Sequence, residues 1–168
     1  MYSLTMTFEG TPPQADDRAN SFPWPPVLFA GVIGVGWLLT RHFPLTWPGT
    51  DDWPARIIGL GFGAAGIALS LAAIVTLRRH GTTVMPDGRS TALVTSGPYV
   101  RFRNPIYLGE VLLLLSVAEI TKSFWYVAAA ALFALLVTRL QILPEERYLE
   151  RRFGNAYLDY KAHSRRWV

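Results

Sequence analysis

The chain has 168 residues and a formal net charge of +4, with 51% hydrophobic and only 17% charged residues. A soluble domain has about 25% charged residues, and a disordered chain combines low hydrophobicity with high charge, so this composition excludes a disordered protein. The absence of cysteine excludes disulfide-stapled modules, thiol catalysis and cysteine-ligated zinc or iron–sulfur sites. The length allows a single domain, and we expect one membrane domain over residues 1–168.

Residues 1–26 form a polar, proline-rich N-terminal segment. Its one arginine is outnumbered by three acidic residues, and the first apolar run starts late. We therefore expect no cleaved signal peptide, and we expect order only where the segment meets the membrane. Its role is left open.

Four apolar stretches follow, and they predict an all-α integral membrane protein of about four transmembrane helices. The second has 21 residues without a charge, enough to cross a hydrocarbon core of about 30 Å, and it shows no polar face. A soluble helical bundle is the less favoured alternative. The stretches are Val27–Thr40, Ile57–Leu77, Ile106–Ile120 and Phe124–Leu143. The first two helices thus fall within 27–77.

Lysine and arginine predict the orientation. The segment 78–104 has five arginines against one aspartate, and the tail after Leu143 is also rich in basic residues. By the positive-inside rule both segments are cytoplasmic, so we expect a multi-pass inner-membrane protein with both termini inside. Trp47, Trp53 and Trp125 then lie at the outer interface and Trp24 at the inner one. Topology explains the basic residues, so we expect no nucleic-acid partner.

Gly59 and Gly63 form a G-x-x-x-G pair in the second stretch, continued by Gly66 and Ser70. Small residues at this spacing allow close helix packing in a membrane. We favour packing within the chain over a dimer interface, and the oligomeric state stays open.

Three charged residues lie inside the predicted spans. Each costs at least ~2.5–3.5 kcal/mol to insert and is a functional candidate by default. A tight hairpin around Lys122 places Glu110 and Arg139 at similar depth, which predicts an ion pair or a shared polar cavity, structural or catalytic. Glu119 lies near the outer end and is expected to reach the interface.

The long loop between the second and third stretches carries turn signals at Pro86-Asp87-Gly88 and at Thr95–Pro98. Asn104-Pro105 is expected to start the third helix, because proline is harmless in a first helical turn. The loop has about 27 residues, and loops longer than about 12–15 residues are usually functional or disordered. Its aromatic and apolar residues argue against disorder.

The tail is expected to form amphipathic cytoplasmic helices lying on the membrane surface. Pro144-Glu145-Glu146 is a typical helix start, with two acids at the positive helix N-terminus. Gly154 is expected to break the tail into two short helices. One apolar stripe is predicted at Leu149, Phe153, Ala156, Tyr157 and Tyr160.

Two blocks, Thr95–Gly109 and Glu145–Tyr160, separated by a hydrophobic hairpin, resemble the isoprenylcysteine carboxyl methyltransferase family. The resemblance covers roughly residues 80–168, and residues 78–168 would form the methyltransferase core. It implies S-adenosylmethionine as methyl donor, held by the cytoplasmic loop, the start of the third helix and the C-terminal helices. No metal is expected.

The resemblance also assigns residues. The cofactor-binding set is Gly97, Pro98, Tyr99, Arg103, Asn104, Pro105, Tyr107, Glu145 and Glu146, and the catalytic pair is Arg139 and Glu145. Glu145 would take the donor's ammonium and Arg103 its carboxylate, while Tyr99 and Tyr107 offer ring faces. Many relatives have histidine at the position of Asn104, so a proton-carrying role there is doubtful.

The expected reaction is carboxyl O-methylation of an isoprenylcysteine-type, membrane-embedded substrate, with Arg139 holding the carboxylate. A phospholipid or other lipid methyltransferase is one alternative; an amine acceptor would need a base, for which His80 is the nearest histidine. An NADPH-dependent, sterol-reductase-like enzyme and a non-catalytic membrane scaffold are the others. The acceptor atom is left open between oxygen, nitrogen and sulfur.

Overall fold

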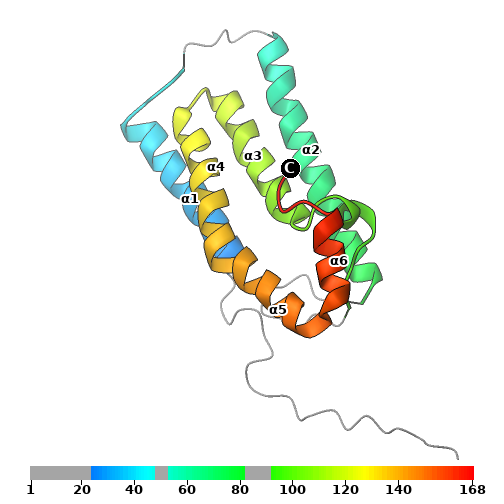
Figure 1. Ribbon diagram of the computed structural model, residues 1–168. Coiled ribbons are helices and arrows are strands. Elements are labelled where there is room, and N and C mark those ends of the chain that lie inside the picture. Colours follow the sequence, from blue (N-terminus) through cyan, green and yellow to red (C-terminus); the bar gives the residue numbers. More distant parts are fainter. Residues whose placement is uncertain (1–23, 48–52, 82–91) are drawn as a thin grey trace, which may run out of the picture.

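The computed structural model describes residues 24–47, 53–81 and 92–168 (Figure 1). The expectations for residues 1–23 and for the turn at 86–88 lie outside these ranges. The described residues form helices joined by short connections. They are α1 (Trp24–His42), α2 (Trp53–Arg79), the 3₁₀ turn η1 (Gly97–Val100), α3 (Pro105–Thr121), α4 (Phe124–Val137), the π-helical segment η2 (Thr138–Ile142), α5 (Leu143–Phe153) and α6 (Asn155–His163).

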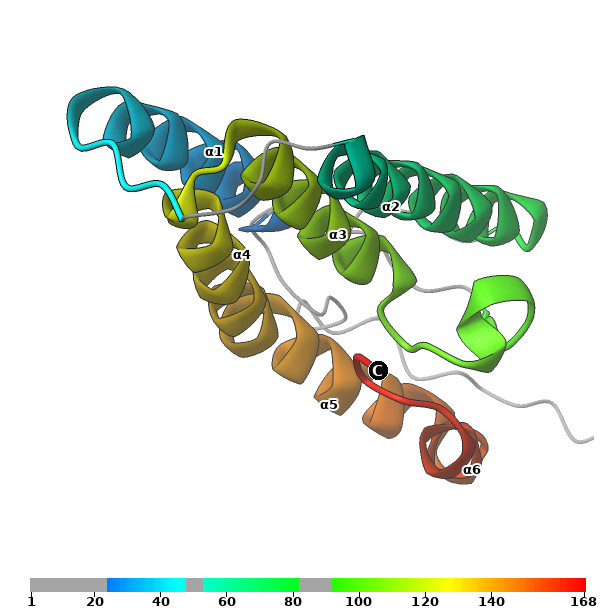
Figure 2. The same ribbon diagram turned by 90° about the horizontal axis from the view of Figure 1, so that it is seen from above.

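The long helices pack in a spatial order that differs from the chain order. α2 packs along α3, α3 along α4, and α4 along α1. Figure 2 shows α3 between α2 and the α1–α4 pair. α5 and α6 lie at the opposite end of the bundle from the α3–α4 turn (Figure 1).

Within the described residues, three helices are long and apolar enough to cross a membrane: Trp24–His42, Trp53–Arg79 and the continuous run Phe124–Phe153. α3 has 17 residues, about 25 Å, and lies alongside them. Large apolar side chains such as Trp37, Leu60 and Leu71 are more than half exposed, as expected for side chains that face lipid. The chain is therefore an all-α membrane protein, as predicted.

The glycines of α2 allow it to approach α3 closely. A Cβ at Gly66 would come within 2.6 Å of the carbonyl oxygen of Gly109, and one at Gly63 within 2.8 Å of the Ser116 hydroxyl. Gly59 faces Glu119 in the same way. The prediction of close helix packing within the chain is confirmed.

The α3–α4 hairpin turns at Lys122, which takes the left-handed conformation with φ of 52°. Its ammonium pairs with Glu119, so this acid is neutralised at the end of the bundle. The indole of Trp125 donates to the Phe43 carbonyl at 2.6 Å, which ties the hairpin to the segment after α1.

The C-terminal helix does not start afresh at Pro144, contrary to the prediction. α4, η2 and α5 form one continuous helix, in which the Leu143 amide donates to the Thr138 carbonyl. A proline inside an α-helix removes a hydrogen bond and clashes with the carbonyl four residues earlier. The wider π turn just before Pro144 accommodates this, as π-bulges do elsewhere.

Gly154 separates α5 from α6, as predicted, with a φ of 53° that favours glycine. The break changes the helical phase, so the predicted continuous apolar stripe is wrong. Tyr157 is fully buried, whereas Ala156 is exposed and Leu149 is half-buried. α6 contacts the loop that precedes α3 through Tyr160, whose hydroxyl donates to the Tyr99 carbonyl.

Candidate functional site

The loop before α3 starts at a glycine that cannot be replaced without strain. Gly97 has a φ of 59°, and a Cβ there would come within 2.7 Å of the Thr76 hydroxyl on α2. After this turn the chain runs beside the C-terminal segment, where Phe102 and Arg165 form a parallel bridge. The Arg103 amide donates to the Arg165 carbonyl at 2.7 Å. The end of the chain is thus paired with the predicted cofactor loop.

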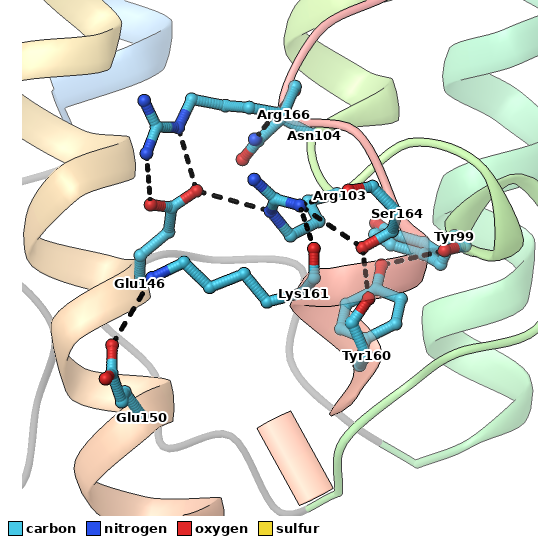
Figure 3. A network of polar contacts seen from close by, with 9 residues as sticks. All are labelled: Tyr99, Arg103, Asn104, Glu146, Glu150, Tyr160, Lys161, Ser164 and Arg166. Atoms are coloured by element: carbon cyan, nitrogen blue, oxygen red, sulfur yellow. Dashed lines mark hydrogen bonds and ion pairs between the residues drawn. The ribbon is translucent and has the colours of Figure 1, made fainter. Parts of the chain in front are cut away.

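Arg103 lies at the centre of this contact. Its Nε donates to the Glu146 carboxylate at 3.3 Å, and its Nη1 donates to the Lys161 carbonyl at 3.1 Å and to the Ser164 carbonyl. A guanidinium at the C-terminal end of α6 satisfies carbonyls that have no partner within the helix and interacts favourably with the helix dipole. Figure 3 shows this arginine enclosed by α5, α6 and the tail.

Glu146 receives a second guanidinium. Arg166 donates to its two carboxylate oxygens at 2.9 and 2.7 Å, and this hydrogen bond raises the pKa of Arg166. The neighbouring Asn104 donates from Nδ2 to the Arg166 carbonyl at 3.0 Å. We call the set Arg103, Asn104, Glu146, Ser164 and Arg166 the tail clamp, since it fixes residues 164–166 onto α5 and the loop.

Tyr160 adds a contact from α6 to the loop, because its hydroxyl donates to the Tyr99 carbonyl at 2.7 Å. Burial raises the pKa of Tyr160 to about 12, against opposing effects of Ser164 and Arg103. The phenol therefore stays protonated and can donate throughout the physiological range.

A second group of residues lies beside the clamp and contains acids and phenols. Burial, and then the Glu145 carboxylate, raise the pKa of Tyr99. Glu145 also acts electrostatically on Tyr107, which in turn lies within range of Glu110. We call Tyr99, Tyr107, Glu110 and Glu145 the acidic pocket. Its four residues come from η1, the first turns of α3 and the start of α5, and the name refers to their electrostatic interactions.

Two buried polar groups belong to this region. The Gln141 side chain, one turn before Glu145 and fully buried, interacts with the Glu145 carboxylate. The Glu110 side chain is half-buried as a whole, but its Oε2 atom is inaccessible to solvent and has no hydrogen-bond partner among the described residues. Glu110 was predicted from the sequence as a functional candidate, whereas Gln141 was not, although a glutamine one turn before an acid in an apolar run is a visible signal.

The predicted pairing of Glu110 with Arg139 is not formed in the described part of the chain. Arg139 is exposed on η2, whereas Val137 and Gln141, two residues to either side, are fully buried. Residues two apart on a helix point to nearly opposite faces, so the burial of Val137 and Gln141 turns Arg139 outward. The helical phase of η2 therefore keeps Arg139 away from Glu110.

His80 is also placed away from the pocket. Its Nδ1 contacts the Thr76 carbonyl at 2.9 Å, and its Nε2 contacts the Ser96 hydroxyl at 3.3 Å. The ring is exposed at the end of α2 and connects this helix to the loop. It is therefore a poor candidate for a base at the acidic pocket.

The structure thus divides the predicted site residues into two sets. Glu145, Tyr99 and Tyr107 lie in the acidic pocket, whereas Arg103, Asn104 and Glu146 belong to the tail clamp. Gly97, Pro98 and Pro105 shape the backbone that joins the two sets. Ser164 and Arg166 were not predicted as site residues, because no local pattern indicates that a chain end returns to a loop about 60 residues earlier.

Comparison with known proteins identifies the family. Residues 54–156, more than half of the chain, match the family described as phospholipid methyltransferase. The match includes α2, the loop, α3, α4 and α5, and therefore the whole acidic pocket. The chain belongs to this family.

Two relatives are similar in sequence. The cobalt-zinc-cadmium resistance protein CzcN of Cupriavidus metallidurans is 31% identical over 121 residues, which cover 71% of this chain and 50% of the relative. An uncharacterized protein of Haemophilus influenzae is 46% identical over 37 residues, which cover 22% of this chain and 59% of the relative. The chain thus spans about half the length of the curated relatives that it matches.

Proposed function

We propose that this member of the phospholipid methyltransferase family transfers a methyl group from S-adenosylmethionine to a lipid-like acceptor in the membrane. The observation that carries the proposal is the electrostatic interaction of Glu145, at the start of α5, with Tyr99 of η1 and Tyr107 of α3. Family membership supports the same reaction.

The acidic pocket fits the chemistry of this donor. S-adenosylmethionine supplies a methyl group on a sulfonium cation and also carries an ammonium group. Glu145 would hold the ammonium in a charge-assisted hydrogen bond. The phenol rings of Tyr99 and Tyr107 offer faces that attract a cation, worth roughly 0.5–2 kcal/mol each. These groups are half-buried, which limits the access of water, and their positions would orient the reactants for an in-line displacement.

The tail clamp would act indirectly. Arg103 donates to Glu146 and to the C-terminal end of α6, and Arg166 also donates to Glu146. Both arginines of the clamp therefore have protein partners. We assign Arg103, Asn104 and Glu146 the role of holding the loop and α5 together around the pocket. Gly97, Pro98 and Pro105 give the loop its course.

The sequence predicts two kinds of acceptor for such a methyltransferase: an isoprenylcysteine-type carboxylate and a phospholipid headgroup. A carboxylate acceptor needs a cation, but Arg139 is exposed and the clamp arginines are paired. Two carboxylates, Glu110 and Glu145, would repel it. This arrangement favours an amine-bearing lipid headgroup.

We also propose that the pocket lies at the cytoplasmic face of the inner membrane, with both termini inside. The donor would then enter from the cytosol and the lipid from the bilayer. The basic residues of α5 and α6 support this orientation by the positive-inside rule.

Isothermal titration of the detergent-purified protein with S-adenosylhomocysteine, and with NADPH in parallel, tests the proposal. Binding of S-adenosylhomocysteine alone, lost in Glu145→Gln, is the expected result. Binding of NADPH alone would indicate a reductase, and binding of neither would leave a membrane scaffold. Transfer of a labelled methyl group to an aminoethyl phospholipid or to a farnesylated cysteine then distinguishes the acceptors.

A further inference from the structure

Residues 165–168, which we call the strap, follow α6 and lie outside the helices of the described chain. Arg166 connects two of those helices. Its carbonyl accepts a hydrogen bond from Asn104 at the N-terminal cap of α3, and its guanidinium binds Glu146 of α5. Figure 2 shows the end of the chain, in red, between α5 and the first turns of α3. The strap therefore lies between two helices whose residues we assign to the methyl donor.

Hydrogen bonds fasten the strap to the loop before α3. The Arg165 amide donates to the Arg101 carbonyl at 2.8 Å, and the Arg103 amide donates to the Arg165 carbonyl at 2.7 Å. Asn104 adds its bond to the Arg166 carbonyl at 3.0 Å. α6 ends before the strap begins. The strap can therefore leave the loop without the unfolding of any helix.

The ion pair between the strap and α5 can also open at low cost. Arg166 binds both oxygens of the buried Glu146 carboxylate, and Arg103 binds the same carboxylate at 3.3 Å. Breaking a buried ion pair is costly because it leaves one charge uncompensated. Here Arg103 stays on Glu146 when Arg166 leaves, and the Arg166 side chain is already 37% exposed to solvent. Departure of the strap therefore leaves no unpaired buried acid.

Trp167 favours the docked position of the strap. Its side chain is partly buried and packs against the hydrophobic core of the bundle. Burial of apolar area is favourable, whereas Val168 beside it is 78% exposed and contributes little. A segment with so few buried contacts opens locally at a free energy well below that of global unfolding.

We propose that the strap is a gate for the methyl donor, which detaches to admit S-adenosylmethionine between α3 and α5 and docks again behind it. This inference rests on the proposed methyl transfer and adds the way in which the site opens and closes. Ser164 is the hinge, because its hydroxyl donates to the Tyr160 carbonyl at 2.6 Å and its carbonyl accepts from Arg103. The docked strap retains the donor and limits the access of water during the reaction.

A reversible crosslink tests the gate. The chain has no cysteine, so an introduced pair has no competing thiol. Phe102 and Arg165 face each other in the parallel bridge. Bridged chains lie about 4.8 Å apart, within the ~4.4–6.8 Å that separate the Cα atoms of a disulfide. Phe102→Cys combined with Arg165→Cys therefore locks the strap when oxidised and frees it when reduced.

Association and dissociation rates of labelled S-adenosylhomocysteine are measured for the double variant in both redox states. We expect oxidation to slow both rates about 10-fold or more and to leave the affinity within about threefold, because a closed gate blocks passage in both directions. Each single variant, Phe102→Cys or Arg165→Cys, is the matched control and should show no change on oxidation. Unchanged exchange in the locked protein, or a lost affinity, would overturn the inference.

A second measurement uses the wild-type protein, so it remains decisive if the double variant does not fold. Trypsin can cut after Arg165 and Arg166 only when the strap is detached, and the mass of the protein records the loss of Trp167 and the residues after it. A ligand held behind the docked strap lowers the detached population, so S-adenosylhomocysteine at about 100 times its Kd should slow this cleavage about 10-fold or more.

The failure of the gate and the failure of the proposed function give different results. Wild type that binds S-adenosylhomocysteine but is cleaved equally fast with and without it would refute the gate alone. Wild type that does not bind S-adenosylhomocysteine would refute the proposed function, and the gate with it.

Discussion

Glu146 and Arg166 are joined by two hydrogen bonds of 2.9 and 2.7 Å across 20 residues of chain. Arg103 reaches the same carboxylate from a third segment (Figure 3). Glu146 thus connects α5, the C-terminal segment and the loop before α3.

Breaking the clamp should destabilise the protein. Arg166→Ala leaves the buried Glu146 with one cation fewer, so we expect a loss of about 1–3 kcal/mol in unfolding free energy and faster proteolysis of the tail. Thermal unfolding and limited proteolysis in detergent measure both effects. Arg165→Ala is the matched control, because the side chain of Arg165 is exposed and only its backbone pairs with the loop. Equal behaviour of the two variants would contradict the clamp.

Glu145→Gln should weaken S-adenosylhomocysteine binding by about 10- to 100-fold, since a hydrogen bond to a charged group contributes about 1.5–3 kcal/mol. Isothermal titration measures the change. Glu150→Gln, which removes only a partly exposed partner of Lys161 on the same helix, should bind as wild type does. Full affinity in Glu145→Gln would place the donor elsewhere.

Arg139→Ala should retain methyl transfer within about threefold of wild type, because the side chain lies outside the pocket. The labelled-methyl assay tests this with both candidate acceptors. A loss of about 100-fold or more with a carboxylate acceptor alone would identify Arg139 as its binding residue, as predicted from the sequence.

Gly66→Ala should separate α2 from α3. Its new methyl group would meet the Gly109 carbonyl oxygen at 2.6 Å, and overpacking of this kind costs about 1–3 kcal/mol. Gly61→Ala has open space around the added carbon and should leave the melting temperature unchanged or higher. Thermal unfolding of the two variants provides the test. Equal destabilisation would show that the effect does not come from the contact between α2 and α3.

Alkaline pH should release α6 from the loop. Burial raises the pKa of Tyr160 from 10.0 to about 12, so its stabilising contribution is complete below pH 10 and is lost as the pH rises toward 12. The absorbance of the phenolate and the extent of unfolding, both recorded from pH 10 to about 12, measure this effect. Tyr160→Phe lacks the titrating hydroxyl and should lose the phenolate signal assigned to that range; an unchanged signal would contradict the assignment.

The sequence by itself determined the features that depend on local chemistry. The uncharged stretch of α2 indicated a membrane helix, because a bilayer leaves no partner for a polar face. The spacing of Gly59 and Gly63 indicated close packing. Pro105 and Gly154 marked a helix start and a helix break, since proline lacks an amide hydrogen and glycine tolerates positive φ.

Only the tertiary structure decided which charged residues meet. Arg139 matched Glu110 in depth, yet the phase of the α4–η2 helix turned it outward. Arg103 and Glu146 belonged to the motifs that predicted cofactor binding, yet they pair with each other, and Arg166 from the C-terminal segment binds the same carboxylate. The depth of a residue in the membrane and the order of the motifs can each be predicted from a single segment of sequence. Ion pairing depends on how helices separated in sequence rotate and cross, and burial of apolar area sets that geometry.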